Sequence, residues 1–472
     1  MTTYQGDRTA APSLDETAIQ AFASRVRGRV IRPADLDYDD ARAIQNGLID
    51  RQPGLIVRCS GAADVIEAVN VAREHDLLVA VRGGGHNVAG NAVCDDGLVI
   101  DLSGMRGVHV NPATHTVRVQ GGATWADVDR ETQVFGLAVP GGVVSSTGVA
   151  GLTLHGGMGH LRRKCGLSID NLLSVDIVTA DGRLRTASAD ENADLFWAVR
   201  GAGSNFGVVT SFEFRAHPLG PSVMLCAALY TLEDAPRVVP AWRDFMATAP
   251  EEVSSLVVFW SVPAGFPPEL QGRPVAIVAA LYAGAAEEGE RVLQPLRELA
   301  TPALDMSGVL PYTAIQSAFD PFFPKGLLMY WKSLYVEELA DELIRELCRL
   351  AADRPSALSP IDIWHHGGAM RRAGADATAF GRRDAPFMLS FDATWTDPRD
   401  TERNIAWTRA AWASMHRFSS GGLYLNFPGF GEEKEDLLRA AYGPNYERLQ
   451  SLKAAYDPTN LFRMNLNIPP SA

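Results

Sequence analysis

Glycine is concentrated in one stretch of this chain, in six clusters that lie within about 125 residues. Glycine adopts positive φ without strain and lets a backbone approach a ligand closely, and amides exposed in such turns form concave sites for anions. A single cluster is most simply a tight turn. Six in succession favour a chain that wraps one long, pyrophosphate-bearing ligand, and therefore a large cofactor. The clusters are Gly83 to Gly85, Gly121-Gly122, Gly141-Gly142, Gly148 to Gly151, Gly156 to Gly159 and Gly201 to Gly207.

The usual motifs of several enzyme classes are missing from the sequence. The dinucleotide fingerprint G-x-G-x-x-G fails because Val88 and Phe206 stand where its third glycine belongs. No Walker A, H-E-x-x-H or G-x-S-x-G motif is present. The five cysteines are spread singly, which argues against a zinc ribbon or a thioredoxin-type site. His365-His366 has no third ligand at useful spacing, so we expect no metal.

Composition and charge narrow the class further. The 472 residues are too many for most single cores and predict two domains, possibly three. The net charge of −13 is opposite to that of a general nucleic-acid binder. No apolar run reaches the roughly 18 residues of a membrane span, and residues 1–33 lack the apolar core of a signal peptide. We therefore expect a cytoplasmic protein that binds neither nucleic acid nor membrane.

The first half alternates short strands and helices around glycine-rich joints, which predicts an α+β fold. Asp181-Gly182 between two strand-like runs indicates a hairpin. The expected strands are 56–59, 77–81, 98–102, 116–120, 175–179, 183–186 and 208–214, and the expected helices are 62–75 and 194–199.

The sequence pattern changes at Leu219-Gly220-Pro221, after which glycine clusters are fewer and the expected strands and helices are longer. This pattern predicts an antiparallel sheet backed by helices, and thus the domains 1–218 (first part of the cofactor domain), 219–443 (substrate domain) and 444–472 (a tail that returns to the first domain). The expected strands are 227–231, 255–261, 275–282, 328–335 and 388–395, and the expected helices are 287–299, 337–352, 404–415 and 446–456.

His86 follows three glycines at the end of an expected strand. By itself such a histidine is most simply a turn or capping residue. With a flavin in the groove, a neutral imidazole nitrogen can bond to the flavin 8α-methyl carbon. Arg82 can supply charge to a pyrophosphate, or be a surface charge at a strand end.

At this point the ordered motifs resemble a family, the FAD-linked oxidases of the vanillyl-alcohol-oxidase type, in the berberine-bridge-enzyme-like branch. The resemblance runs from about Pro53 to Pro218 and returns at the C-terminus. It rests on Arg82-Gly-Gly-Gly-His-Asn87, Val139-Pro-Gly-Gly142, Ser146-Thr-Gly-Val-Ala-Gly-Leu152, Gly156-Gly157, Arg163-Lys-Cys-Gly-Leu-Ser-Ile-Asp-Asn171, Asp194-Leu-Phe-Trp197, Arg200-Gly-Ala-Gly-Ser-Asn-Phe-Gly-Val-Val209, Tyr424-Leu-Asn-Phe427, Tyr456-Asp-Pro-Thr-Asn-Leu-Phe462 and Asn465-Leu-Asn-Ile468.

The resemblance implies a two-domain FAD-binding fold, in which the middle domain roofs the substrate pocket. His86 matches the histidine that bonds covalently to the flavin. Val144 stands where some relatives have a cysteine that makes a second bond, so one link is expected. Cys165 stands where relatives usually have tyrosine, and we interpret it as packing. The residues implied to bind FAD are Arg82, Gly83, Gly84, Gly85, His86, Asn87, Gly90, Val139, Pro140, Gly141, Gly142, Thr147, Gly148, Gly151, Leu152, Gly156, Gly157, Gly159, Asp170, Asn171, Gly207, Val208, Val209, Tyr424, Asn426, Asn465 and Asn467.

Two residues are candidates for the catalytic base. Tyr424 is the first choice, on an expected strand whose Tyr and Asn lie beside the flavin ring in the family. A phenol ionises near 10, so Tyr424 needs a positive charge or a second proton acceptor nearby. Asp392 is the second candidate, although a lone Asp in a strand is more often simply the exposed alternate.

The implied function is that of an oxidase. A base removes a proton from an alcohol or amine while hydride passes from the adjacent carbon to FAD, and O2 then takes the electrons and gives H2O2. A flavin dehydrogenase with another acceptor, a flavin-binding protein without catalysis and a colourless metabolite-binding protein are the alternatives. The substrate is a small molecule whose identity, like the oligomeric state, the sequence does not reveal. Four aromatic side chains can line its pocket but are each interpreted as core: Trp260, Tyr330, Trp331 and Trp364.

Overall fold

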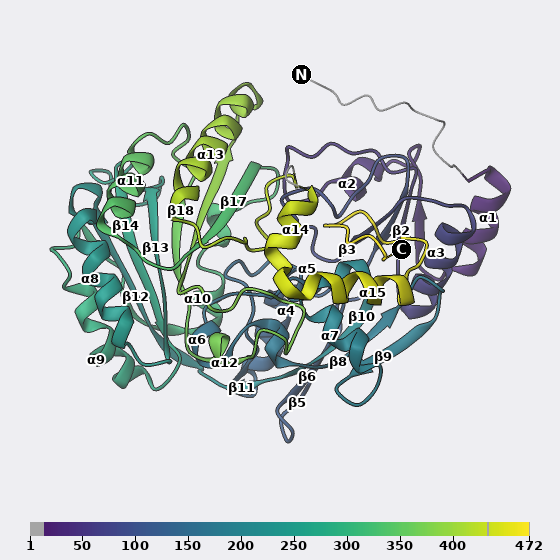
Figure 1. The fold of residues 1–472 in the computed structure, drawn as a ribbon, viewed down its shortest axis with the longest axis horizontal. Coiled ribbons are helices and arrows are strands. Elements are labelled where there is room, and N and C mark those ends of the chain that lie inside the picture. The colour runs from purple at the N-terminus through teal and green to yellow at the C-terminus, as the bar shows by residue number, and fades with distance from the viewer. Residues whose placement is uncertain (1–13, 432–433, 472) are drawn as a thin grey trace.

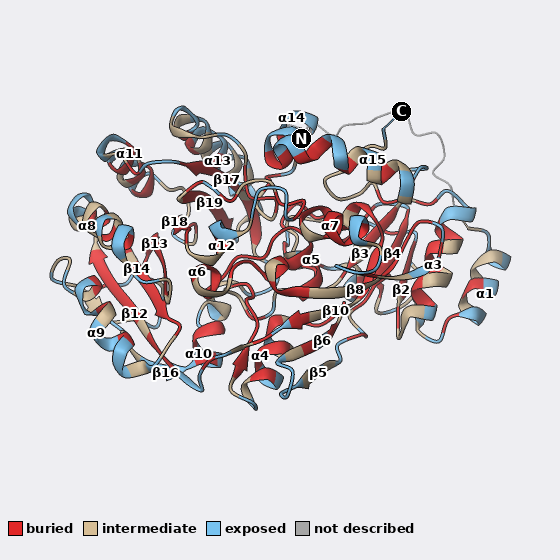
Figure 2. Cartoon of the chain, turned by 60° about the horizontal axis from the view of Figure 1, so that its bottom comes forward, coloured by how far each residue is buried: buried red, intermediate tan, exposed pale blue. Residues whose placement is uncertain are grey.

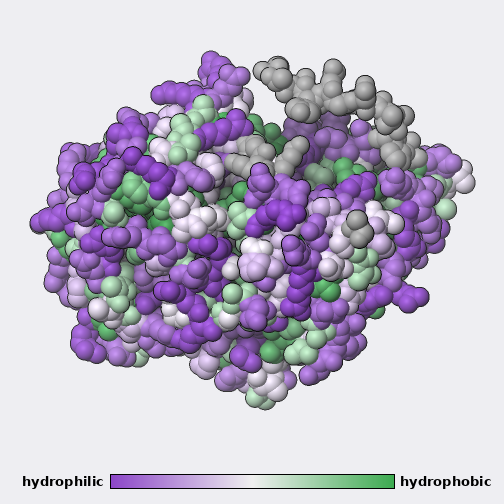
Figure 3. Space-filling model, viewed as in Figure 1, coloured by the Kyte–Doolittle hydropathy of each residue, from purple (hydrophilic) through white to green (hydrophobic). Residues whose placement is uncertain are grey.

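A computed structural model describes residues 14–431 and 434–471. The chain forms two halves that meet along a central seam (Figure 1). Both halves combine helices with sheets, so the α+β prediction is confirmed. The face shown in Figure 3 is mostly hydrophilic, with apolar side chains only in small groups. Along the described ranges, we find no helix with the length and apolar character needed to cross a membrane.

The first half contains two sheets with helix α3 (Ala62–Glu74) packed between them. Val65, Ala68, Val69 and Ala72 share one face of α3 because they recur at helical spacing, and they join a core with residues of both sheets. One sheet has the order β1-β2-β4-β3, with β2, β4 and β3 parallel, and the other is antiparallel with the order β5-β6-β10-β8-β9. Their strands are β1 (Arg29–Ile31), β2 (Leu55–Arg58), β3 (Val79–Arg82), β4 (Leu98–Asp101), β5 (Val108–Asn111), β6 (Thr116–Gln120), β8 (Leu172–Val178), β9 (Leu184–Ser188) and β10 (Val208–Arg215).

The second half is built on one antiparallel sheet with the order β15-β12-β14-β13-β18-β19-β17, to which β16 adds by pairing with β12. Its helices cover the outer face (Figures 1 and 2), and their apolar sides form a core with that face. Strands β13 and β19 are buried along their whole length, because the first half covers the inner face. The strands are β12 (Ser222–Thr231), β13 (Val253–Ser261), β14 (Pro274–Tyr282), β15 (Leu304–Asp305), β16 (Gly308–Pro311), β17 (Leu328–Val336), β18 (Ile361–His365) and β19 (Phe387–Trp395), and the covering helices are α8 (Ala235–Thr248), α9 (Ala286–Arg297), α11 (Asp341–Ala352) and α13 (Thr401–Met415).

The remaining elements are short and lie mostly along the seam and the termini. A two-stranded pair joins β7 (Leu137–Ala138) to β11 (His217–Pro218). The other helices are α1 (Glu16–Arg25), α2 (Tyr38–Arg42), α4 (Trp125–Gln133), α5 (Val149–Leu154), α6 (Arg162–Cys165), α7 (Ala193–Ala202), α10 (Tyr312–Gln316), α12 (Ala369–Arg372), α14 (Lys434–Tyr442) and α15 (Tyr446–Tyr456).

The C-terminal segment packs against the first half (Figure 1). Lys453 on α15 is fully buried and pairs with Asp457 at 2.6 Å, and its ammonium also donates to the carbonyls of Asn205 and Phe462. Asp457 in turn accepts from the amides of Leu461 and Phe462. This buried network explains the Asp-Pro-Thr-Asn turn after α15. The domain boundaries 1–218, 219–443 and 444–472 stay a prediction.

Most expected strands and helices are present with shifts of a few residues at their ends, but one expected strand is wrong. Tyr424 to Phe427 form a turn, closed by a hydrogen bond from the Phe427 amide to the Tyr424 carbonyl at 2.8 Å. The preceding Gly421 and Gly422 have φ of 84° and 73°, which breaks the extended conformation before it starts. The turn is attached to β17, where Ser333 Oγ accepts from the Tyr424 amide at 3.1 Å.

Candidate active site

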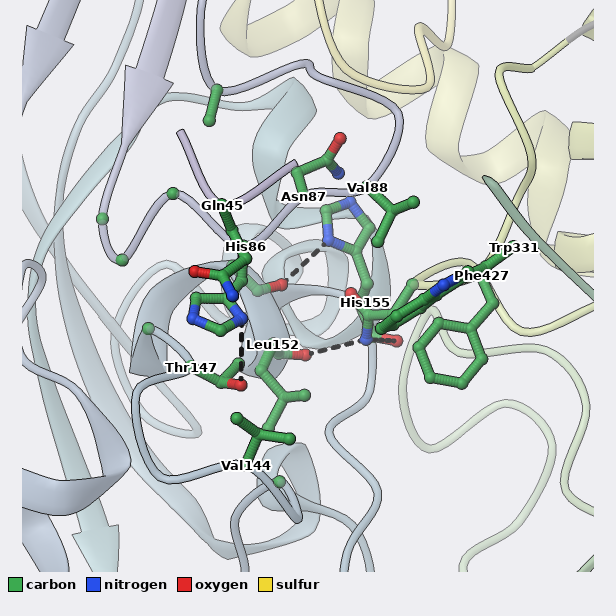
Figure 4. A pocket seen from close by; sticks show the side chains of 18 of the residues that line it. Gln45, His86, Asn87, Val88, Val144, Thr147, Leu152, His155, Trp331 and Phe427 are labelled. Atoms are coloured by element: carbon green, nitrogen blue, oxygen red, sulfur yellow. Dashed lines mark hydrogen bonds between the residues drawn. The ribbon is translucent and has the colours of Figure 1, made fainter. Parts of the chain in front are cut away.

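A deep cavity lies between the two halves. Its floor is the glycine-rich part of the first half, and its roof is the inner face of the large sheet. Figure 4 shows His86 and Thr147 on one side, with Trp331 and Phe427 on the other. The predicted FAD-binding residues that line it are Gly83, Gly84, Gly85, His86, Asn87, Gly142, Thr147, Gly148, Gly151, Leu152, Gly207, Val209, Tyr424, Asn426 and Asn465.

The other predicted FAD-binding residues do not line this cavity. Arg82 is buried and pairs with Asp101 at 2.5 Å, so its interpretation as a surface charge is wrong. Asp170 makes a bidentate ion pair with Arg383, whose two terminal nitrogens lie 2.7 and 2.9 Å from the carboxylate oxygens. Asn171 donates to two backbone carbonyls of its own turn. The residues outside the lining are Arg82, Gly90, Val139, Pro140, Gly141, Gly156, Gly157, Gly159, Asp170, Asn171, Val208 and Asn467.

The glycines of the floor have two different roles: some allow close packing of backbones, and others leave free space at the cavity wall. A Cβ on Gly84 would lie 2.4 Å from the amide nitrogen of Gly148, and one on Gly148 would lie 2.3 Å from that of Gly84, so these two turns touch through their backbones. A Cβ on Gly151 would meet nothing within 4 Å. Its missing side chain therefore leaves free space at the cavity wall. A floor of backbone without side chains fits a long, flat cofactor such as FAD.

His86 is held by two hydroxyls at the edge of this floor. Its Nε2 lies 3.0 Å from Ser146 Oγ. Its Nδ1 lies 3.5 Å from Thr147 Oγ1 (Figure 4). Burial lowers the pKa of His86 to about 4, and the negative charge of Asp320 partly opposes this. The imidazole is therefore neutral at pH 7 and keeps a nitrogen lone pair, as nucleophilic attack requires. Cys165 lies outside the cavity and packs against Leu161 and Tyr312, in agreement with a packing role.

Tyr424 lies on the cavity wall with its hydroxyl in an amide-rich corner. The hydroxyl oxygen accepts from the Met158 amide at 3.1 Å and from Asn426 Nδ2 at 2.9 Å. Burial raises its pKa to about 12, and these two donors offset only part of the rise. Tyr424 is therefore a neutral phenol at pH 7. Its own proton remains free to be donated to a ligand atom.

A pair of carboxyl groups lies in the roof of the cavity, and sequence reasoning found only one of them. Asp362 on β18 stands opposite Ser390 on β19, and Asp392 follows two residues later on the same face. Ser390 Oγ lies 3.4 Å from Asp362 Oδ2 and 3.2 Å from Asp392 Oδ2. Both carboxyls are buried, so the interpretation of Asp392 as an exposed alternate is wrong. Asp362 was missed because β18 was not predicted. An acid among apolar residues in a short run was the available signal.

The two carboxyls share a dry environment that resists double ionisation. Burial raises the pKa of Asp362 to about 7. Burial, and then the charge of Asp362, raise the pKa of Asp392 well above its usual value. Two buried acids that both contact the Ser390 hydroxyl cannot both ionise readily, so the pair holds at least one proton near pH 7. The Oδ1 atom of each carboxyl has no hydrogen-bond partner among the described residues.

Aromatic side chains form much of the remaining wall. Trp260, Trp331 and Trp364 line the cavity. Trp260 and Trp364 are also buried members of a hydrophobic core, and Tyr330 packs into a small core away from the cavity, so the core prediction is confirmed for these three. It is wrong for Trp331, which is only partly buried. Trp331 stands directly opposite Asp392 across β17 and β19. The indole nitrogens of Trp260 and Trp364 are buried, and within the described chain no group accepts from them. Lining residues that the sequence did not suggest come from distant segments: Gln45, Asn91, His155, Met158, Phe319, Phe323, Met329 and Met464.

No metal cluster is evident in the parts of the chain that the structure describes, where no three His, Cys, Asp or Glu residues converge. His366 instead has its ring nitrogens 3.1 Å from the Ala385 carbonyl and 3.1 Å from Met158 Sδ.

Comparison with known proteins agrees with this architecture. An FAD-binding-domain family matches residues 53–188, and a family described as berberine and berberine-like matches residues 423–469. The chain is 31% identical to the FAD-linked oxidoreductase YgaK of Bacillus subtilis, with 95% of this chain and 98% of YgaK covered. It is also 31% identical to (R)-6-hydroxynicotine oxidase of Paenarthrobacter nicotinovorans, with 94% and 97% covered.

Solved structures give the same result for the fold. The crystal structure of 6-hydroxy-D-nicotine oxidase from Arthrobacter nicotinovorans superposes with a TM-score of 0.85 at 29% identity, with 94% of this chain and 98% of that chain covered. The Physcomitrella patens BBE-like 1 protein superposes with a TM-score of 0.86 at 23% identity, with 96% and 99% covered. Sequence motifs, fold and relatives agree: the chain is an FAD-dependent oxidoreductase and belongs to the vanillyl-alcohol-oxidase type of flavoproteins, in the berberine-bridge-enzyme-like branch.

Proposed function

We propose that this enzyme is an oxidase that removes two electrons and two protons from an alcohol or amine of a small organic substrate, with O2 as the final acceptor and H2O2 as product. FAD is held by the glycine floor and through one covalent bond to His86. The observation that carries the proposal is the Asp362–Asp392 pair, which lies in the roof of the same cavity whose floor bears His86.

The bound flavin supplies the two-electron acceptor, and the chain supplies the base and the positioning. A carboxyl that titrates near 7 is well matched to accept a proton from a substrate O–H or N–H at neutral pH. Tyr424 is protonated there, so it cannot take that proton first. We therefore assign the base to the carboxyl pair and give Tyr424 the role of a hydrogen-bond donor to substrate. From the sequence, Tyr424 was the first candidate for the catalytic base and Asp392 the second, and this assignment reverses their order.

The walls favour a ring-shaped substrate that carries acceptor atoms. Flat faces of Trp260, Trp331 and Trp364 suit stacking against a ring. The unpartnered indole N–H groups of Trp260 and Trp364 require acceptors, such as hydroxyl, carbonyl or ring nitrogen atoms. The names of similar proteins include one oxidase of a nitrogen-containing ring compound and one oxidase of a sugar: a 6-hydroxynicotine oxidase and a xylooligosaccharide oxidase.

Anaerobic mixing tests this proposal. Cyclic alcohols, sugars and cyclic amines are mixed with the purified enzyme without oxygen, and the long-wavelength flavin absorbance is followed. A substrate should bleach it, and admission of air should restore the colour with one H2O2 per turnover. Bleaching that air does not reverse, but that an artificial acceptor does, would replace the oxidase with a dehydrogenase. Protein that never carries a flavin would overturn the proposal.

A further inference from the structure

A loop of the substrate half reaches across the seam to the segment that holds His86. The loop contains a 3-10 turn, Asp320–Phe322, between β16 and β17. The Asp320 carboxylate accepts two hydrogen bonds from Ser145, one from its amide at 2.8 Å and one from its hydroxyl at 2.5 Å. Phe319 and Phe323, on either side of this turn, line the cavity. The loop therefore contacts the floor at Ser145 and also forms part of the cavity wall.

Ser145 is followed directly by the two residues that contact the His86 ring. Ser146 Oγ lies 3.0 Å from Nε2, and Thr147 Oγ1 lies 3.5 Å from Nδ1. Asp320 thus fixes the start of the segment whose hydroxyls orient the imidazole. Its charge also acts on that imidazole, since it opposes the effect of burial on the pKa of His86.

We propose that Asp320 is a positioning residue for covalent attachment of the flavin: it anchors the Ser145–Thr147 segment against His86 and supplies a negative charge that stabilises the ring as it bonds to carbon. The inference rests on the covalent His86 bond of the proposed function. Ser145, Ser146 and Thr147 are first-half residues, whereas Asp320 belongs to the second half. Attachment is therefore completed only when the two halves have docked.

The chemistry of attachment shows why a carboxylate helps. A bond forms between one imidazole nitrogen and the flavin methyl carbon, one methyl C–H bond breaks, and the imidazole loses its N–H proton. The two electrons and two hydrogens that leave pass to dioxygen, which becomes H2O2. While the ring carries both the new carbon and its own proton, it is a cation. In a partly dry site a nearby carboxylate stabilises such a cation far more than it would in water.

Further hydrogen bonds hold the end of this loop and the start of β17. Asn46 Nδ2 donates to the Val88 carbonyl at 2.8 Å and to the Met329 carbonyl at 2.9 Å, and Asn46 Oδ1 accepts from the Met329 amide. Gln45 Nε2 donates to the Phe323 carbonyl at 2.7 Å. These bonds hold the loop whether or not Asp320 is charged. An Asp320→Asn variant should therefore keep its fold and lose mainly the charge.

The test follows attachment itself. Full-length apoprotein is mixed with FAD in air, and flavin that stays on the chain after denaturing electrophoresis is measured by fluorescence and by intact mass. We expect Asp320→Asn to slow attachment at least tenfold while non-covalent FAD binding changes less than threefold, and Asp320→Glu to restore most of the rate. Asp384→Asn, an exposed acid of the same half that pairs with Arg382, should have no effect.

A second pair of variants tests charge without touching Asp320. Ala318 is exposed two residues before it. At low ionic strength Ala318→Lys should attach flavin two- to threefold more slowly than Ala318→Glu, which a purely structural role of the loop would not produce. Wild-type attachment rates in Asp320→Asn, or equal rates in the two Ala318 variants, would overturn the role of Asp320. Wild-type enzyme without covalent flavin would instead refute the covalent bond of the proposed function.

Discussion

Two carboxyl groups line this site, Asp362 and Asp392, and the fold buries both of them. If the Asp362–Asp392 pair is the base, Asp362→Asn and Asp392→Asn should each slow flavin reduction by about 10²–10⁴-fold, the usual contribution of a general base. Stopped-flow reduction under anaerobic conditions measures this directly. Ser261→Ala, on the same sheet but outside the cavity lining, is the control. Reduction at the wild-type rate in both acid variants would return the role of base to Tyr424.

The pH dependence follows from the same pair. Because the pKa of Asp362 is about 7 in the folded protein, its carboxylate is available only above that pH. We therefore expect the rate of flavin reduction to rise with pH and level off above about 8. In Asp362→Asn this step should move to another pH, because the Asp392 carboxyl then titrates without the charge of Asp362 beside it. A wild-type rate that falls with rising pH across 6 to 8 would contradict the assignment.

The same raised pKa values carry a stability cost. A buried acid whose folded pKa exceeds its unfolded value of about 4 binds a proton more tightly in the folded state, so folding becomes less favourable as pH rises from 4 through the folded pKa. Asp392→Asn removes that penalty. Its melting temperature should exceed that of wild type by a few degrees at pH 8 and should be similar to it at pH 4, as scanning calorimetry can show. A variant that melts lower than wild type at pH 8 would show that Asp392 stabilises the fold instead.

At the scale of elements, two turns meet backbone to backbone at Gly84 and Gly148. A side chain on Gly84 would come within 2.4 Å of the facing amide, so Gly84→Ala should separate the turns and lower both the melting temperature and the affinity of the apoprotein for FAD. Gly151→Ala meets no atom within 4 Å and should fold normally but bind FAD more weakly, because its methyl group enters the cavity. Gly61→Ala, where a methyl group is equally free and which does not line the cavity, should leave FAD binding unchanged. Similar FAD affinities for Gly151→Ala and Gly61→Ala would argue that the cofactor lies elsewhere.

The local pattern of apolar residues predicted the long strands and helices but not the short ones. The apolar runs of β17 and β19 stand out because nearly every residue is buried. By contrast, β18 has only five residues, carries an aspartate and ends at His365, which is followed by another histidine and two glycines. The alternation of a strand therefore cannot be recognised in its sequence. The turn after Gly422 has the alternation of a strand, and only the positive φ of its glycines distinguishes it.

At the scale of the whole molecule, the cavity is assembled from segments far apart in the chain. Motifs identified the floor, because glycines and His86 are adjacent in sequence. The roof depends on the register of β13, β18, β19 and β17, which sequence alone does not supply. Gln45 and Phe323 show the limit most clearly, since they are bonded to each other across the seam yet separated by 278 positions.

The C-terminal tail depends on one buried ion pair. Lys453→Met would leave Asp457 charged and without its partner in a fully buried site, which costs about 3–5 kcal/mol. We expect this variant to lose fold stability, with a melting temperature well below that of wild type in scanning calorimetry. Lys453→Met combined with Asp457→Asn should recover part of the loss, because no charge is then stranded. A double variant no more stable than the single one would show that the hydrogen bonds of Lys453 to Asn205 and Phe462 matter more than the charge.

The covalent bond between FAD and His86 is the claim on which the assignment of floor and cofactor depends, and one measurement tests it. Purified wild-type enzyme and His86→Ala are precipitated with acid, and the yellow flavin is sought in pellet and supernatant. We predict colour in the wild-type pellet and, for His86→Ala, colour only in the supernatant. Colour released from wild type would contradict the covalent bond, and a colourless preparation of both would contradict the cofactor site itself.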